Sequence, residues 1–496
     1  MTGTYVDELV AALDRAGDRP VVRRDGRDTT GRELLTAIYR YARALDRLGA
    51  GRGSLVALFA PNRPEALAVR YAANLIGAGT VYLSAPAAEH HRAALLRTVD
   101  PQLLVVFPET AGLVPAGTAG PVVAVGDTGT GHGRLDELAA AESGDPVPSR
   151  GRPDDLAMVA SSGGTTGVPK GSWRTFAQYA AMVSVPSPTD RRQLANGPLA
   201  YLTRVLVDIT LLGGGCAVLA DGVDPAGTLA AVEQERITDL FLVEPQLFEL
   251  MDHPDVDRRD LSSLRSLVHV GAQAPPVLRE RARRRLGQVV GHTYGASEMG
   301  IVSVLRPAEN TPDRFDCAGR LVPGVEVRLR RPDGSAAGPG EPGEIEVRSP
   351  AMSSGYRNQP ERQAAVFVGG RFRTGDLGTL DSDGYLHVHG RVADIRWIDG
   401  TMVSPLLVQD TLCRLPSVRY AVVVVDPATG AWVVPAEAWP GSTVDPAECL
   451  AAVRAAYGPS AADPLVVLPV DRVPLTEQGK ADRAAIAALP RPTLAR

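Results

Sequence analysis

The stretch Ser161-Ser162-Gly163-Gly164-Thr165-Thr166-Gly167-Val168-Pro169-Lys170-Gly171 decides how the rest of the chain is interpreted. It follows the apolar segment 156–160, which predicts a short buried strand. Residues this small allow backbone N–H groups to close around phosphate oxygens, while the hydroxyls add donors and the lysine adds charge. It is not a Walker A loop, because the Gly-Lys-[Ser/Thr] ending is missing. A flexible linker is the alternative, but a linker seldom ends in Pro-Lys-Gly after a buried strand, so we favour a phosphate-binding loop.

Length and composition bound the possibilities for the whole chain. Its 496 residues exceed one ordinary hydrophobic core and predict two to four domains or subdomains. A content of 44% hydrophobic and 22% charged residues is typical of a soluble globular protein. The net charge of −5 favours neither nucleic acid nor a membrane surface as a partner.

Cysteine usage and the first residues indicate a reducing, cytoplasmic location. Residues 1–15 carry acidic side chains and lack the basic and apolar regions of a signal peptide. The longest aliphatic runs are too short to span a bilayer. Without a CxxC pair, the scattered cysteines predict neither a zinc site nor a disulfide framework; they are Cys216, Cys317, Cys413 and Cys449.

Strand and helix patterns alternate over most of the chain, which predicts an α/β fold with a largely parallel sheet covered by helices. We expect helices near 6–13, from Thr30, over 61–76 and over 199–212, and strands at 55–59, 81–83, 103–107, 240–243 and 267–270. Residues 111–153 are interpreted as surface loop with one strand at 122–125. From residue 316 short strands alternate with Gly/Pro turns, which favours an antiparallel or barrel-like part. After residue 391 comes a smaller unit that ends in the loop 476–479 and a short helix.

Four later motifs offer chemistry, although each is weak alone. In Tyr294-Gly295-Ala296-Ser297-Glu298 an aromatic face could stack on a base and a carboxylate could hold Mg²⁺, or the tyrosine is simply a core residue in a turn. Asp376 follows a tight turn and suits ribose hydroxyls, or it forms an ordinary Asx turn. Arg391 stands at the expected domain boundary. Lys480 lies at a loop tip, where most lysines are solvated and inert.

Taken in order, these segments resemble the core motifs of the ANL superfamily, which contains acyl- and aryl-CoA synthetases, adenylation domains and luciferases. The resemblance covers residues 30–490. It implies a large N-terminal domain of mixed sheets flanked by helices, with a small barrel-like part, over residues 1–390. A small, mobile α+β C-terminal domain carrying the catalytic lysine would follow over residues 391–496. The implied activity is an ATP-dependent acid–thiol ligase that forms acyl-AMP and releases pyrophosphate.

The same resemblance implies a role for each motif residue. Lys480 would reach the α-phosphate and the substrate carboxylate, Glu298 would bind Mg²⁺, and Thr166 would assist catalysis. The triphosphate would be held by Ser162, Gly163, Gly164, Thr165, Thr166, Gly167 and Lys170. The rest of the nucleotide would contact Gly271, Ala272, Tyr294, Gly295, Ser297, Asp376 and Arg391.

The sequence narrows the class of the acid substrate only in part. The Ser162-Gly163-Gly164 variant with Arg174 and Tyr179 most resembles aryl-acid-activating enzymes, so we expect an aryl or medium acyl substrate. At the pocket helix, Tyr201 stands where relatives carry a histidine or the aspartate that fixes an α-amino group. Tyr201, Leu202 and Thr293 are the expected pocket residues. Asp208 shares a helical face with Tyr201 and could contact an amine or hydroxyl of the substrate; we favour an exposed or capping acid.

The acceptor is left open by the hinge region. Ala393 replaces the usual Asp or Lys, and the loop that lines the thiol tunnel in relatives contains Trp397 and Asp399. CoA or a phosphopantetheinyl carrier protein acting in trans is the expected acceptor. Alternatives are an amine acceptor, an amino-bearing acid, nitrite as the acid, or a homologue that binds nucleotide without catalysis.

Overall fold

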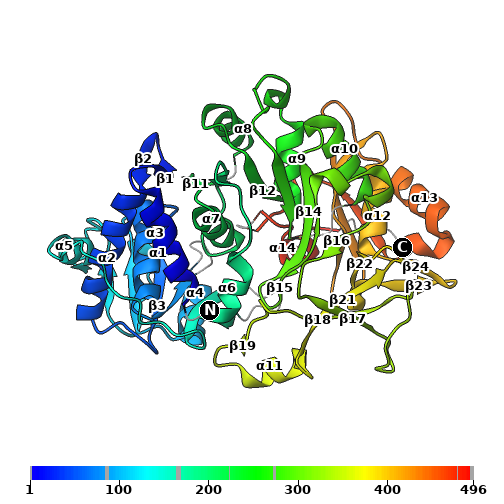
Figure 1. Ribbon diagram of the computed structural model, residues 1–496. Coiled ribbons are helices and arrows are strands. Elements are labelled where there is room, and N and C mark those ends of the chain that lie inside the picture. Colours follow the sequence, from blue (N-terminus) through cyan, green and yellow to red (C-terminus); the bar gives the residue numbers. More distant parts are fainter. Residues whose placement is uncertain are drawn as a thin grey trace.

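The structure is a computed structural model that describes residues 3–83, 89–162, 169–222, 224–271, 275–476 and 479–491. Two large sheets lie side by side, and a smaller unit packs against the second (Figure 1). The helices α6 (Phe176–Val183) and α7 (Leu202–Leu212) lie between the two sheets.

The first sheet has eight strands and contains the N-terminal strands of the predicted α/β pattern. Its strands are parallel except β9 and β19, which run antiparallel to their neighbours. In spatial order they are β19 (Gly355–Tyr356), β9 (Lys170–Thr175), β8 (Leu156–Ser162), β4 (Gly79–Tyr82), β3 (Leu55–Phe59), β5 (Leu103–Val106), β6 (Val122–Ala124) and β7 (Gly133–Arg134).

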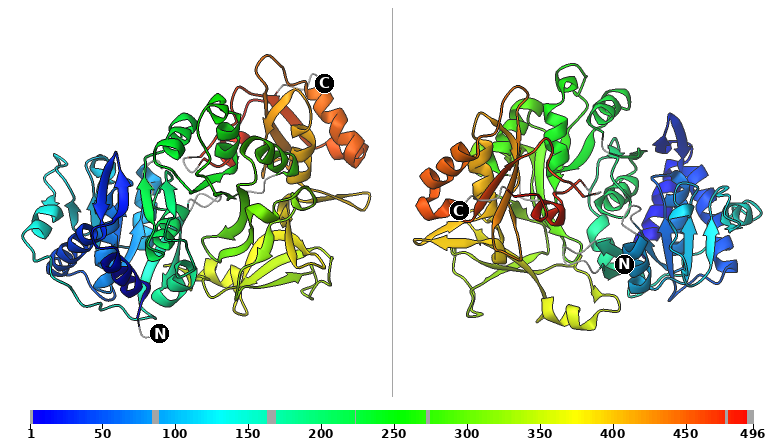
Figure 2. Two further views of the ribbon diagram at one scale, coloured as in Figure 1. Left: turned by 45° about the horizontal axis from the view of Figure 1, so that its top comes forward. Right: turned by 180° about the vertical axis from the view of Figure 1, so that it is seen from behind.

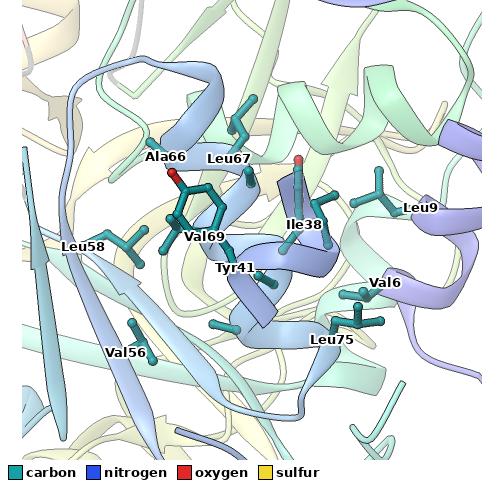
Figure 3. Close-up of a cluster of buried hydrophobic side chains, with 14 of the residues drawn as sticks. Val6, Leu9, Ile38, Tyr41, Val56, Leu58, Ala66, Leu67, Val69 and Leu75 are labelled. Atoms are coloured by element: carbon teal, nitrogen blue, oxygen red, sulfur yellow. The ribbon is translucent and has the colours of Figure 1, made fainter. Parts of the chain in front are cut away.

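Amphipathic helices cover this sheet and form its core. They include α1 (Tyr5–Ala16), α2 (Gly31–Arg47), α3 (Pro64–Leu75), α4 (Glu89–Val99) and α5 (Leu135–Ala140). Figure 3 shows apolar side chains of α1, α2 and α3 meeting those of β3, among them Leu9, Ile38 and Leu58. The predicted capping box begins α2, because the Thr30 side chain accepts a hydrogen bond from the Glu33 N–H.

The second sheet has fourteen strands, and it changes from parallel to antiparallel at β14–β15. The predicted barrel-like part is therefore hydrogen-bonded to the parallel strands. Its spatial order is β17 (Glu326–Arg330), β18 (Gly343–Arg348), β21 (Arg371–Leu380), β22 (Tyr385–Arg391), β16 (Gly319–Leu321), β15 (Gly300–Leu305), β14 (Val290–Ala296), β13 (Ser266–Val270), β12 (Asp239–Val243), β10 (Arg192–Ala195), β11 (Cys216–Leu219), β1 (Pro20–Arg24) and β2 (Arg27–Thr30), with β20 (Phe367–Val368) paired to β21. The helices of this part are α8 (Pro225–Gln234), α9 (Glu244–Asp252), α10 (Pro276–Leu286) and α11 (Pro360–Val366).

The C-terminal unit follows β22 and is mixed α+β, as expected. It begins with a two-stranded hairpin, β23 (Arg396–Ile398) and β24 (Thr401–Val403). A second small sheet and three helices complete it: β25 (Val418–Ala421), β26 (Val424–Val425), β27 (Trp432–Ala438), β28 (Leu465–Pro469), α12 (Pro405–Cys413), α13 (Pro446–Tyr457) and α14 (Arg483–Ala487). Buried side chains of this unit share one hydrophobic cluster with α9 and α10 of the preceding part, and Figure 2 shows the two parts in contact from two sides.

Most predicted elements are confirmed, one expectation is wrong, and one strand was not predicted. The segment 111–153 is not all loop around one strand, because α5 forms at 135–140 with Leu135 and Ala139 buried. The residues after Lys170 form β9, which the polar composition of the segment concealed. All four cysteines are free and buried. Among the described residues, no helix is long and apolar enough to cross a membrane.

Candidate active site

The β8–β9 hairpin brings together the two ends of the predicted phosphate loop. Ser162 pairs with Lys170 and Ser161 pairs with Gly171 in antiparallel register. The residues between these ends, 163–168, lie outside the described part of the chain, as does Ala272. The phosphate contacts expected of Gly163, Gly164, Thr165, Thr166 and Gly167, and the nucleotide contact expected of Ala272, therefore stay predictions.

Lys170 and Glu298 face one another across a tyrosine that the sequence did not single out. The Tyr356 hydroxyl donates to Glu298 Oε1 at 2.7 Å, and Lys170 Nζ lies 5.4 Å from the centre of the Tyr356 ring. Burial lowers the pKa of Lys170, while the charge of Glu298 opposes that shift. Tyr356 follows Gly355 in the two-residue strand β19, and no periodic pattern marks so short an element.

A second group consists of Tyr294, Asp376 and Arg391. The sequence motifs predicted each of these residues as a nucleotide contact but did not show that they touch one another. The Tyr294 hydroxyl donates to Asp376 Oδ2 at 2.6 Å, and Arg391 Nε lies 3.3 Å from Asp376 Oδ1. Asp376 and Arg391 are direct partners across β21 and β22, which fixes their proximity. Burial raises the pKa of Asp376, and the Arg391 charge and the Tyr294 hydroxyl oppose that shift. The Asp376 carboxylate is thus held in place within reach of a cation.

The turn between Tyr294 and Glu298 is held close to its neighbours. A Cβ on Gly295 would lie 2.4 Å from the Gly300 carbonyl oxygen, so only glycine fits this position of the β14–β15 pair. The Ser297 carbonyl accepts a hydrogen bond from the Ser172 hydroxyl of β9 at 3.2 Å. The Tyr294 motif is therefore fastened to the strand that follows the predicted phosphate loop.

Lys480 reaches this site from the C-terminal unit. A Cβ placed on Gly271, whose φ is +88°, would lie 2.9 Å from Lys480 Cε and 3.3 Å from Nζ. Burial lowers the pKa of Lys480, the Arg391 charge lowers it further, and the Glu298 charge raises it. The side chain thus stands within electrostatic range of Glu298 and Arg391, one from each group described above, although both lie far from it in the chain.

Lysine usage singles out the same two side chains. The sequence holds 52 basic residues, of which Lys170 and Lys480 are the only lysines. Arginine serves every other basic position, and the two side chains are not interchangeable where a compact point charge is needed. A count of lysines would have directed attention to both positions from the sequence alone.

The expected pocket residues lie on α7, between the sheets, and on β14 of the second sheet. Tyr201 and Leu202 are half-buried at the start of α7 and pack against the core of the first sheet. Thr293 is buried on β14, where it pairs with Val270 of β13. That the three side chains line one pocket stays a prediction.

Asp208 is neither a substrate contact nor an exposed or capping acid, so both interpretations of it are wrong. It is fully buried and forms a two-pronged ion pair with Arg70, with both N–H···O distances at 2.8 Å. The hydroxyls of Tyr71 and Tyr179 donate to its two oxygens at 2.5 Å each. Its acceptor capacity is used by the protein itself, and Arg70 lies 138 positions away, beyond any local pattern.

The hairpin β23–β24 carries the residues that left the acceptor open. Trp397 is 60% exposed, and the turn is formed by Asp399 and Gly400, both with positive φ. Arg396, next to Trp397, lies over the Trp432 ring at 5.4 Å, which fastens the hairpin to β27. The Trp397 ring is therefore presented to solvent from a fixed base.

The fold of two adjoining sheets and a small C-terminal unit is that of the adenylate-forming enzymes. The chain belongs to the family described as AMP-binding enzyme, whose model matches residues 9–357.

Individual relatives agree with this class and differ in acceptor. The chain is 32% identical to the medium/long-chain fatty-acid–CoA ligase FadD8 of Mycobacterium tuberculosis, over 97% of this chain and 89% of that protein. It is 34% identical to a feruloyl-CoA synthase of an Amycolatopsis species, over 92% of this chain and 93% of the relative. Among solved structures it resembles the amide bond synthetase McbA of Marinactinospora thermotolerans, with a TM-score of 0.85 and 32% identity over 97% of this chain and 99% of that one.

Proposed function

We propose that this protein activates an aryl or medium acyl carboxylic acid with ATP and then transfers the acyl group to CoA. The observation that carries the proposal is that Lys480, seated at Gly271, lies within electrostatic range of Glu298 and of Arg391, the partner of Asp376. Two cations, Arg391 and Lys480 of the C-terminal unit, thus lie close together. Positive charge is needed at this site because the two substrates, ATP and a carboxylate, are both anions. The feruloyl- and fatty-acid–CoA relatives support the choice of acid and acceptor.

In the first half-reaction a carboxylate oxygen forms a bond to the α-phosphorus of ATP. The bond from that phosphorus to the bridging oxygen breaks, and pyrophosphate leaves. Both reactants are anions, so fixed cations that meet the developing charge lower the barrier. Lys480 would stabilise the α-phosphate and the attacking carboxylate, Lys170 the departing phosphates, and Asp376 with Arg391 would hold the ribose.

Glu298 fits a magnesium site of the kind that nucleotides complete. Mg²⁺ usually takes one or two carboxylates and fills its other positions with water and substrate phosphates. Glu298 has one oxygen bonded to Tyr356 and a second oxygen for the metal. Among the described residues no group of three or more acidic, His or Cys side chains is placed to hold a metal ion, and Glu298 would be one ligand beside water and phosphate. Bound Mg²⁺ would offset phosphate charge.

In the second half-reaction the thiol of CoA loses its proton to solvent, and its sulfur forms a bond to the acyl carbon. The bond between that carbon and the phosphate oxygen breaks, and AMP leaves. A phosphopantetheinyl carrier protein presents the same thiol chemistry and would use the same step. The four free, buried cysteines are compatible with a reducing compartment in which these thiols persist.

A screen of pyrophosphate release tests the proposal. Purified protein with ATP and Mg²⁺ is offered benzoic, cinnamic, fatty and amino acids, each with CoA, a carrier protein, a primary amine or no acceptor. We expect release with aryl or medium acyl acids and a CoA thioester detected by mass spectrometry. Absence of pyrophosphate release across the panel would overturn adenylation and favour a nucleotide-binding protein without catalysis.

An amine acceptor is the second candidate function. It is favoured by the likeness to an amide bond synthetase over 97% of the chain and by the exposed Trp397 on the hinge hairpin. The acyl carbon would then bond to an amine nitrogen, which loses a proton as AMP leaves. An amide in place of a thioester in the same screen identifies this function.

A further inference from the structure

The first turn of α9 holds the C-terminal unit at the place where Lys480 enters. Gln409 of α12 donates its side-chain amide N–H to Glu244 Oε1 at 2.6 Å, and both side chains are buried. Two residues further, the Gln246 amide lies against Gly479, where an added Cβ would stand 2.3 Å from Gln246 Nε2. We call Glu244 and Gln246 the α9 platform.

The α9 platform and Gly271, against which Lys480 lies, follow the ends of two neighbouring strands of one sheet. Val243 ends β12 and pairs with Val270, so Glu244 and Gly271 follow at the same end of neighbouring parallel strands. Gln246 Oε1 accepts the Val243 N–H at 3.3 Å, which fixes the Gln246 side chain against the strand end. The residue it contacts, Gly479, directly precedes Lys480 in the chain. A displacement of the Gln246 side chain would therefore change the position of Gly479 and of Lys480 next to it.

Gly479 is shaped for this contact. Its φ is +74°, and its N–H donates to the Thr476 carbonyl at 2.8 Å, while the Thr476 N–H donates to the Lys480 carbonyl at 2.7 Å. These two hydrogen bonds tie Gly479 and Lys480 to Thr476. Any side chain at position 479 would meet the Gln246 amide before the lysine reached Gly271.

The buried carboxyl of Glu244 has few hydrogen-bond donors to replace the water that it loses on burial. It receives one hydrogen bond from a neutral amide, and burial raises its pKa to about 8. The charged and titratable groups around it are Arg279 of α10, Cys413 of α12 and Tyr420 of β25. The Arg279 guanidinium is engaged with the Cys317 carbonyl. Contact between the two parts therefore favours the protonated carboxyl.

We propose that Glu244 and Gln246 are positioning residues that dock the C-terminal unit for adenylation and are not needed for acyl transfer. The inference rests on the proposed function, since it assigns the platform to one of its two half-reactions. In the proposed function Lys480 contacts the α-phosphate and the carboxylate of the first half-reaction, so we expect contacts that seat it to affect that step and to spare the other.

The first test separates the half-reactions in Gln246→Ala. We expect ATP–pyrophosphate exchange to fall by about tenfold or more in kcat, because small displacements of a catalytic group are costly, with the KM for ATP unchanged. Acyl transfer from chemically prepared acyl-AMP should keep its wild-type rate. Gln234→Ala, at the exposed end of α8, is the matched control and should change neither rate. An equal loss in both half-reactions, or no loss of exchange, would overturn the proposal.

A double-mutant cycle tests the contact itself. Gly479→Ala should lower exchange on its own, because the methyl group meets the Gln246 amide and because a φ of +74° strains a residue with a side chain. In the Gln246→Ala background there is room for that methyl group, so the second loss should be clearly smaller than additive. Strictly additive losses would show that the two residues act independently and would overturn the platform. Lack of exchange in the wild type would instead contradict the proposed function.

The pH profile of exchange tests Glu244. Docking must bind a proton on this carboxyl wherever the separated parts leave it ionised, so raising the pH from about 5 towards 8 should disfavour docking and exchange. Glu244→Gln preserves the shape and removes the titration, so the ratio of variant to wild-type exchange should rise with pH. A ratio that is constant over this range would overturn the role of Glu244.

Discussion

Two buried carboxylates, Asp208 and Glu244, are treated in opposite ways by this fold. Asp208 receives two N–H groups from Arg70 and two tyrosine hydroxyls, and both charged side chains have no exposed surface. Glu244 receives a single hydrogen bond from Gln409. Asp208 lies where α3, α6 and α7 join the two sheets, whereas Glu244 lies where the C-terminal unit meets α9. The carboxylate in the interior between the sheets thus has four hydrogen-bond donors, whereas the carboxyl at the contact with the C-terminal unit has one.

The largest expected effect comes from breaking the buried pair of Arg70 and Asp208. Arg70→Met should lower the free energy of unfolding by about 3–5 kcal/mol, because Asp208 would remain buried without a cation. Urea denaturation followed by circular dichroism measures this loss. The double variant Arg70→Met/Asp208→Asn should regain part of it. A single variant within about 1 kcal/mol of the wild type would remove the contrast with Glu244.

The next effect concerns activity and leaves stability intact. Lys480→Ala should reduce ATP–pyrophosphate exchange by about 10²–10³-fold, which is typical for loss of one contact to developing charge. Its side chain ends in the site and not in the core, so the urea midpoint should match that of the wild type. Exchange at a near-normal rate would remove Lys480 from the reaction.

An intermediate effect is expected at the far end of α9. Arg281 donates to the Arg419 carbonyl at 2.9 Å, forms an ion pair with Asp252, and lies 4.4 Å from the Trp439 ring centre. Arg281→Leu should weaken docking of the C-terminal unit by about 1–2 kcal/mol, the size of a partly buried cation–π contact. Exchange should then fall by about tenfold, with acyl transfer preserved. A loss confined to acyl transfer would contradict this reading of the interface.

The smallest effect is expected where the charges are exposed. Arg236 and Asp260 pair at 2.8 Å with side chains 57% and 52% exposed. Arg236→Gln should change the free energy of unfolding by less than about 1 kcal/mol, because water and salt screen such pairs. Denaturation at low and high salt measures the difference. A larger change would contradict the expectation that an exposed ion pair contributes much less to stability than the buried pair of Arg70 and Asp208.

The sequence predicted the regular parts of the fold well, because local patterns determine them. Strand β3 matches its predicted bounds, 55–59, and the Thr30–Glu33 capping box begins α2 as expected. The short helix α5 was missed, since six residues in a Gly/Pro-rich segment carry too little periodicity. The partner of Asp208 was missed because Arg70 reaches it through tertiary packing alone.

The candidate site was predicted by residue and only partly by arrangement. The resemblance supplied Tyr294, Asp376, Arg391 and Lys480, and their proximity is a finding of the structure. Tyr356 and the α9 platform were not foreseen, because each acts through a contact between distant segments. Such contacts leave no spacing rule in the chain.

The scarcity of lysine has a practical consequence for observing this enzyme. Reductive methylation with isotope-labelled formaldehyde would mark Lys170, Lys480 and the terminal amine, because the sequence holds no other lysine. Lys170 belongs to the β8–β9 hairpin and Lys480 to the C-terminal unit, so the two methylated amines would give separate NMR signals from opposite sides of the site. The chain thus carries its own pair of spectroscopic reporters, one in the β8–β9 hairpin and one in the C-terminal unit.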